Sequence, residues 1–214
     1  ADVTTGEKRW ESKQIVQPQI HYEDGMVYVY NDDGSIRALS ATDGRERWAA
    51  PLPPNAVITQ MHAERDLLFT TTHDKLLAYQ LSDGKLLWQA ERKGASFGDF
   101  QAVVGDVVLA SFVESGAITR SNLYAFDLQS GEELWSSGYF AQLLKAEEPY
   151  VYIQTRYFMV EEQDTVTIDK INVETGEKTE TFKYDTNPNA SGRFVDRVTG
   201  VKADEEFVYI GTQD

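Results

Sequence analysis

One short phrase recurs along this chain: a glycine in a turn, and a tryptophan four residues after it. The pairs are Gly6 and Trp10, Gly44 and Trp48, Gly84 and Trp88, and Gly131 and Trp135. These are all four tryptophans of the 214-residue chain. Because tryptophan is rare, its return at one position after a turn glycine indicates an internal repeat of about 40 residues.

A fifth copy of the phrase has lost its tryptophan. Gly176 holds the turn position, Glu180 stands where the tryptophan would be, and Phe182 follows two residues later. The repeat therefore continues, in degenerate form, as far as residue 182.

Each repeat reads as a series of short strands. The same order of three strands separated by two turns is predicted in four segments: 24–48, 65–88, 105–135 and 149–182. One further apolar run precedes each of them, at 15–20, 57–61, 100–104 and 140–144. The sequence thus predicts four strands per repeat, and no segment carries a sustained helical period.

A four-stranded antiparallel sheet of this length cannot bury both of its faces alone. Stacking such sheets radially buries each face against the next one, so we predict an all-β fold of the β-propeller type, similar in architecture to WD40 proteins. It would have about four complete blades and a split half-blade at each end. The tryptophan is expected to end the outermost strand and to lay its ring on the neighbouring blade.

The repeats resemble a known family. "ALSATDGRERW" (38–48), "AYQLSDGKLLW" (78–88) and "AFDLQSGEELW" (125–135) are similar to the tryptophan-docking repeat of propellers of the pyrroloquinoline-quinone (PQQ) type. The family pattern has alanine ten residues before the tryptophan, as at Ala38, Ala78 and Ala125. The resemblance covers nearly the whole chain and points to the non-catalytic branch of the family.

The family pattern also has aspartate eight residues before the tryptophan, and here the chain is less regular. Asp2 and Asp127 match this position, whereas Ser40 and Gln80 depart from it. In the fourth blade, Lys170 and Asn172 occupy the alanine and aspartate positions.

We expect residues 1–214 to form a single propeller domain. The first residues correspond to the end of a blade, and 200–214 resemble the first half of one. Three arrangements are consistent with this. The first is part of a propeller of six to eight blades within a larger protein, and the second is a five-blade ring closed by its two ends. The third is an open or domain-swapped arrangement.

The charge and the missing cysteines exclude several functions. The net charge is −15, from 35 acidic and 20 basic residues, and such a surface repels nucleic acid and anionic lipids. The simplest explanation of the charge is solubility. There are no cysteines, so no disulfide, thiolate nucleophile or cysteine-bound metal can form. No apolar run is long enough to insert into a membrane.

The family resemblance implies a second class, the quinoprotein dehydrogenases, which bind PQQ and Ca²⁺ and often carry a vicinal cysteine pair. This chain has no cysteine, and all four tryptophans hold docking positions. We therefore predict no enzyme activity, no cofactor and no catalytic or metal-binding residue. His21 and His62 are expected near the ends of the first strands of adjacent blades, where they could approach each other, but they lack chelating spacing.

A partner surface is predicted at the rim where the first strands of the blades end, since the loops and strand ends of propellers converge there. Its candidates are Gln60, His62, Gln101 and Gln142. A second candidate surface is the long hairpin at 155–167, with Tyr157, Phe158 and Met159. The plainer interpretations are a hydrated channel for the first set and ordinary strand for the second.

The sequence therefore favours a scaffold that binds a protein or peptide, as an assembly factor or a sensor domain. The rival hypotheses are a fragment of a quinoprotein dehydrogenase and a sensor that binds a small ligand at the channel mouth. The resemblance implies a periplasmic, extracellular or lumenal location.

Overall fold

The computed structural model describes the chain with several gaps. Its residues are 4–12, 16–92, 94–114, 120–138, 141–155, 165–185, 198–204 and 206–212. They divide into two compact units, 1–97 and 98–214, and each is described by itself. All regular elements of the described residues are β-strands, as the sequence predicts. In these residues there is no helix that is both long and apolar enough to cross a membrane.

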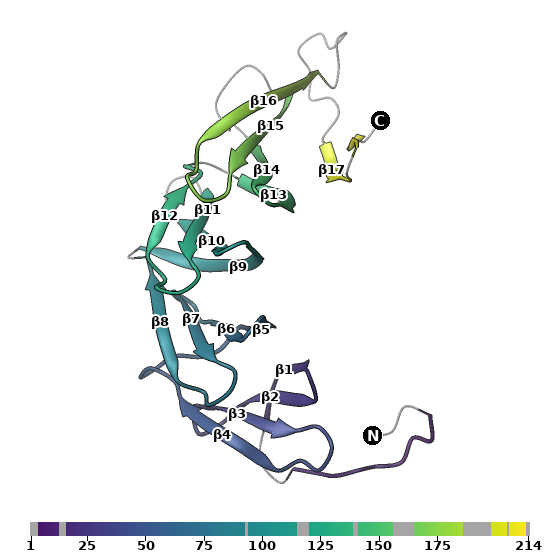
Figure 1. The fold of residues 1–214 in the computed structure, drawn as a ribbon, viewed down its shortest axis with the longest axis vertical. Helices are drawn as coiled ribbons and strands as arrows, with labels where there is room; N and C mark the ends of the chain where they lie inside the picture. The colour runs from purple at the N-terminus through teal and green to yellow at the C-terminus, as the bar shows by residue number, and fades with distance from the viewer. Residues whose placement is uncertain are drawn as a thin grey trace. The chain divides into compact units, whose positions relative to one another are not determined.

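The first unit holds two four-stranded antiparallel sheets (Figure 1). The strands of the first sheet are β1 (Val16–Glu23), β2 (Met26–Asn31), β3 (Ser35–Ser40) and β4 (Glu46–Pro51). Those of the second are β5 (Gln60–Glu64), β6 (Leu67–Thr71), β7 (Lys75–Gln80) and β8 (Leu86–Glu91). In both sheets every strand pairs with its neighbour in the sequence.

The second unit repeats this plan. Its first sheet consists of β9 (Ala95–Val104), β10 (Val107–Glu114), β11 (Arg120–Asp127) and β12 (Glu133–Ser136). The next is built from β13 (Ala141–Glu147), β14 (Tyr150–Thr155), β15 (Thr165–Asn172) and β16 (Lys178–Asp185). A two-stranded sheet of β17 (Val198–Ala203) and β18 (Val208–Thr212) follows. The predicted four-stranded repeat is thus confirmed, with half of a further one.

Strand β9 is longer than predicted, because it begins five residues before the expected start at Phe100. Gly98 allows the strand to lie against Ser111, whose Oγ would be only 2.5 Å from a Cβ at that position. The same hydroxyl accepts a hydrogen bond of 2.8 Å from the backbone N–H of Asp99. Ser111 thus helps to hold the extension, together with the hydrogen bond from the Phe97 N–H to the His73 carbonyl (2.6 Å), and an apolar pattern reports neither.

Burial changes from strand to strand within each sheet. In the four-stranded sheets the second strands are largely buried, and in β6 all five residues are. In the first unit the fourth strands alternate, as in β8, where Trp88 and Ala90 are buried and their neighbours are exposed. The first strands are only partly buried, as in β5. The inner core thus consists of the continuous apolar runs of the second and third strands, as expected for sheets covered on both faces.

In the first unit, the two sheets pack face to face. Tyr28, Ile36 and Trp48 from one sheet join Leu68 and Tyr79 from the other in one buried cluster. Burying a side chain of this size contributes roughly 1.5–3 kcal/mol each. This shared cluster is what the sequence argument requires of neighbouring blades.

In the second unit, an equivalent cluster joins the first two sheets. Leu109 and Leu123 on one side meet Val151 and Ile153 on the other, with Trp135 packed beside them. The same kind of seam therefore recurs in both units.

Candidate functional site

Trp10, Trp48 and Trp135 each bind the repeat that follows them in the sequence. The indole N–H is the donor and a backbone carbonyl is the acceptor each time. The pairs are Trp10 to Ala41 (2.8 Å), Trp48 to Leu81 (2.8 Å) and Trp135 to Val173 (2.7 Å). Each acceptor lies three residues before the turn glycine of its repeat, so the three docks are equivalent.

The indole rings lie on those turn glycines. A Cβ on Gly44 would be 2.7 Å from the ring of Trp10, and one on Gly176 would be 2.5 Å from Cγ of Trp135. Both distances are shorter than carbon atoms tolerate. Both glycines also have positive φ angles, 71° each. The turn position therefore needs glycine for two reasons, the backbone conformation and the room for the ring.

The residue that accepts the indole N–H is itself fixed within its own sheet. The backbone N–H of Ala41 donates to Gly25 O (2.8 Å), and that of Leu81 donates to Asp66 O (2.9 Å). In the second unit, Val173 donates to Pro149 O (2.9 Å). One peptide segment thus connects its own first hairpin to the tryptophan of the preceding repeat.

The family alanine is the direct cross-strand neighbour of the tryptophan. Ala38 pairs with Trp48, Ala78 with Trp88 and Ala125 with Trp135, and all three alanines are fully buried. A small side chain here leaves room for the indole on the adjacent strand. Trp88 is buried and contacts the ring of Phe69. The docking of Trp88 on the following repeat stays a prediction, because Trp88 is in the first unit and that repeat is in the second.

The fourth sheet replaces this pair with charges. Lys170 pairs with Glu180 across β15 and β16, with their charged atoms 3.5 Å apart. The ammonium of Lys170 also lies 4.4 Å from the centre of the Tyr150 ring. A cross-strand ion pair with a cation–π contact therefore stands where the other repeats have alanine and tryptophan.

The tryptophans do not end their strands, and this part of the prediction was wrong. Trp48 and Trp88 are each the third residue of a six-residue strand. The strands continue because Ala50 and Ala90 after them are also buried and paired with the third strand.

The aspartate position of the repeat caps the turn. In the third sheet, Asp127 Oδ1 accepts hydrogen bonds from the backbone N–H groups of Gln129 and Ser130 and from the Ser130 hydroxyl. The Ser130 bond is the main cause that lowers the pKa of Asp127. Asn172 makes the equivalent bonds in the fourth sheet, so the departure noted there preserves the turn.

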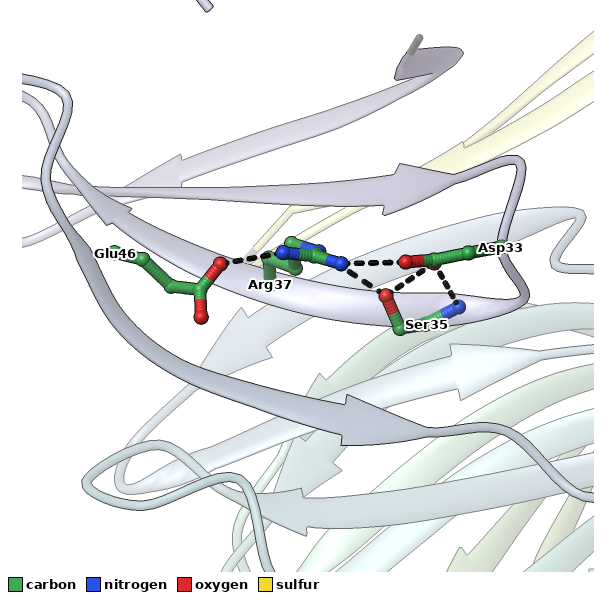
Figure 2. Close-up of polar contacts among 4 residues, drawn as sticks. All are labelled: Asp33, Ser35, Arg37 and Glu46. Atoms are coloured by element: carbon green, nitrogen blue, oxygen red, sulfur yellow. Dashed lines mark hydrogen bonds and ion pairs between the residues drawn. The ribbon is translucent and has the colours of Figure 1, made fainter. Parts of the chain in front are cut away.

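Figure 2 shows a charged network on β3 that sequence reasoning missed. Arg37 lies between Asp33 and Glu46, with 2.7 Å to the latter, and Ser35 completes the network. The Ser35 hydroxyl, followed by Arg37, lowers the pKa of Asp33. The sequence did carry a signal for this network: two opposite charges, Arg37 and Glu46, stand eleven and two residues before the tryptophan of their repeat.

The fourth sheet has an ion pair at the same two positions with the charges exchanged. Asp169 is buried, and its Oδ2 lies 2.7 Å from Nζ of Lys178. Thr181 donates a hydrogen bond of 2.6 Å to the other carboxylate oxygen. A buried carboxylate is thereby paired and hydrogen-bonded, as burial requires.

At the rim, the structure brings His21 and His62 together, as predicted. Their ring centres are 5.6 Å apart, and the backbone N–H of Ala63 donates to Nε2 of His21 over 3.1 Å. Glu23 and Glu64 lie 3.9 and 3.4 Å from the Nε2 atoms of His21 and His62. Burial and then the charge of His62 lower the pKa of His21, against a smaller opposing effect of Glu23.

The remaining rim candidates all lie on first strands. Gln60 is exposed on β5, Gln142 is exposed on β13, and Gln101 is half-buried on β9. Tyr157, Phe158 and Met159 lie outside the described residues. Within the residues that the structure describes, no three His, Asp or Glu side chains gather as a metal site would need.

The chain resembles several curated proteins. The outer membrane protein assembly factor BamB of Yersinia pestis is 21% identical over 152 residues, which cover 67% of this chain and 37% of that protein. BamB of Moranella endobia is 24% identical over 162 residues, 69% of this chain and 41% of its own. The serine/threonine-protein kinase AfsK of Streptomyces griseus is 27% identical over 153 residues, 63% and 18% of the two chains. The chain thus spans less than half the length of each relative, and no family model matches it.

Solved structures give the same fold at low identity. The quinohemoprotein alcohol dehydrogenase of Comamonas testosteroni has a TM-score of 0.55 at 14% identity, over 80% of this chain and 35% of its own. A europium-containing methanol dehydrogenase has a TM-score of 0.53 at 17% identity, over 79% and 43%. The computationally designed Ika4 protein has a TM-score of 0.56 at 12% identity, over 79% and 99%.

Antiparallel four-stranded sheets that pack face to face, with outer-strand indoles seated on the following repeat, define a β-propeller protein of the tryptophan-docking class. The chain has the PQQ-like β-propeller fold, it resembles BamB in sequence, and it shares this fold with quinoprotein dehydrogenases.

Proposed function

We propose that this chain is a non-catalytic PQQ-like propeller scaffold that binds a protein or peptide along the first strands of its sheets. In our proposal, residues 1–214 form one propeller domain or part of a larger one. Two of the curated relatives are named as assembly factors, and this supports a role in protein assembly.

One observation carries the proposal: the first strands of neighbouring sheets approach each other, with the rings of His21 and His62 5.6 Å apart, and they carry exposed polar side chains. β5 and β13 are edge strands of their sheets. Gln60 and Gln142 are exposed on them, whereas the second strands behind them are buried. An exposed edge strand offers backbone groups for pairing and side chains for recognition, which suits a peptide or protein partner.

The tryptophans support a non-catalytic role. Quinoprotein enzymes stack a tryptophan on the quinone, but Trp10, Trp48 and Trp135 are each occupied by a glycine and a carbonyl of the next repeat. The residues of this chain therefore offer no free indole at those positions for such stacking. A location outside the cytoplasm is proposed because two relatives are named for outer-membrane protein assembly.

The test uses photo-crosslinking residues placed at positions 60, 142 and 89 in the native host. Gln89 is the matched control, because it is a glutamine exposed on the outer strand β8. We expect one discrete protein adduct from 60 and 142 and none from 89. With the adduct partner purified, Gln60→Arg should weaken its binding at least tenfold, and Gln89→Arg should not.

Equal adducts from all three positions would contradict the proposal. The enzyme rival has its own test, in which the purified chain is incubated with PQQ and Ca²⁺. A new absorbance band of bound quinone would support the dehydrogenase fragment instead. If the chain is instead a small-ligand sensor, no protein adduct should form. In that case Gln60→Arg should change only the binding of the small ligand.

A further inference from the structure

One rim position carries the same kind of residue in four of the five sheets. It holds a cationic or titratable side chain followed two residues later by an acid, at the end of the first strand. The pairs are His21 and Glu23, His62 and Glu64, Lys145 and Glu147, and Lys202 and Asp204.

This position connects a sheet to the first hairpin of the sheet that follows. In the second unit, Lys145 Nζ donates to the backbone carbonyl of Asp204 over 3.1 Å. In the first unit, His21 Nε2 accepts from the backbone N–H of Ala63 over 3.1 Å. Lysine serves as a permanent donor, whereas histidine serves as an acceptor, and only when Nε2 is unprotonated.

Protonation would therefore remove the bond and place an imidazolium N–H opposite another N–H. Ala63 is buried, with 6% of its surface exposed, so its N–H has little access to water once the acceptor is lost. An imidazolium at His21 would also lie beside the ring of His62, 5.6 Å away.

The charged and titratable groups around this contact come from three elements. They are His62 and Glu64 on β5, Glu23 and Asp24 at the end of β1, and Tyr28 on β2. Burial and His62 oppose protonation of His21, and Glu23 favours it.

We propose that the His21–Ala63 contact is a pH-sensitive link between the first two sheets, closed while His21 is neutral and opened when it is protonated. The link is independent of the proposed function, since it needs no partner.

The direction agrees with the electrostatics. The pKa of His21 is lowered in the folded chain, mainly by burial and then by His62. An open or unfolded His21, with an ordinary pKa near 6.5, binds more protons than a closed one. The link is therefore fully closed above the ordinary pKa and is lost as the pH falls through and below it.

Amide hydrogen exchange at Ala63, measured by NMR from pH 7.5 to 5, tests this directly. After correction for intrinsic exchange, the opening constant should rise by up to about tenfold per pH unit while opening takes up one proton. The rise should disappear in His21→Gln, which can accept the bond but cannot titrate in this range. His73→Gln is the matched control, because His73 is exposed in the turn after β6, and it should keep the wild-type slope.

Titration of the His21 ring protons in the wild-type protein is the second measurement, and it does not depend on any variant folding. A midpoint below that of an exposed histidine supports the link. A midpoint at or above the ordinary value would overturn it, as would an Ala63 opening constant that stays flat with pH or that keeps its slope in His21→Gln.

Discussion

The ring of Trp48 lies directly on Gly84, and its indole N–H is bonded to the carbonyl of Leu81 three residues earlier. A methyl group on Gly84 would occupy the same space as the ring. The glycine and the tryptophan of successive repeats therefore form one joint. The joint explains why these two residue types recur together along the chain.

Replacing Gly84 by alanine should destabilise the chain by about 2–4 kcal/mol, as the sum of a left-handed backbone and an overpacked ring. The control is Gly34→Ala. Gly34 has a similar φ of 77° but nothing within 4 Å of an added Cβ. That variant should lose only about 1–2 kcal/mol, from the backbone alone. Urea unfolding measures both, and equal losses would show that the ring contributes nothing at this site.

Trp48→Phe tests the hydrogen bond of the joint separately from its packing. Phenylalanine keeps an aromatic ring on Gly84 but leaves the Leu81 carbonyl without its donor, at a cost of roughly 1–3 kcal/mol. Trp48→Ala also opens a cavity and should cost about 3–5 kcal/mol. The same order should hold at Trp135 and Val173. If Trp48→Phe were neutral by thermal or urea unfolding, the bond would have no role.

Arg37→Gln should raise the pKa of Asp33 toward its ordinary value, because one of the groups that lower it is removed. The rise should be partial, since the Ser35 hydroxyl is the larger cause and remains. Carboxyl titration by NMR measures it, with Asp127 as the control, since Ser130 governs its pKa. The stability change should be about 1 kcal/mol or less, as for most surface pairs. An unchanged Asp33 would contradict the network in Figure 2.

Tyr79→Phe should stabilise the first unit by about 1 kcal/mol. The Tyr79 hydroxyl is buried and has no hydrogen-bond partner among the described residues, which is costly. Burial also raises the pKa of Tyr79 to about 12. The folded chain therefore keeps this proton where the unfolded chain loses it, and stability falls as the pH rises from 10 toward 12. That fall should be smaller in Tyr79→Phe, and a less stable variant would show that the hydroxyl has a partner.

The fold was predictable because the sequence repeats with a visible period of about 40 residues. The recurrence of Gly44 and Trp48 as Gly84 and Trp88 marked each blade, and alternating apolar runs marked the strands. The approach of His21 and His62 was also predictable, since equivalent positions of adjacent sheets lie near each other.

Other features lay outside what patterns report. The early part of strand β9 is bonded by the Ser111 hydroxyl and by the His73 carbonyl, and no hydrophobic period records such single polar contacts. The Arg37 and Asp169 ion pairs use opposite charges at the same position, so a search for one residue type would not find them. Trp48 and Trp88 do not end their strands, because the alanines two residues after them are also paired with the third strand.

The most direct test of the joint is a double-mutant cycle between Trp48 and Gly84, followed by urea unfolding. If the ring rests on the glycine, Gly84→Ala costs about 2–4 kcal/mol in the wild-type chain but only the backbone part, about 1–2 kcal/mol, when Trp48 is already alanine. If Gly84→Ala costs the same in both backgrounds, the indole is not seated on the next repeat, and the explanation of the repeated phrase is wrong.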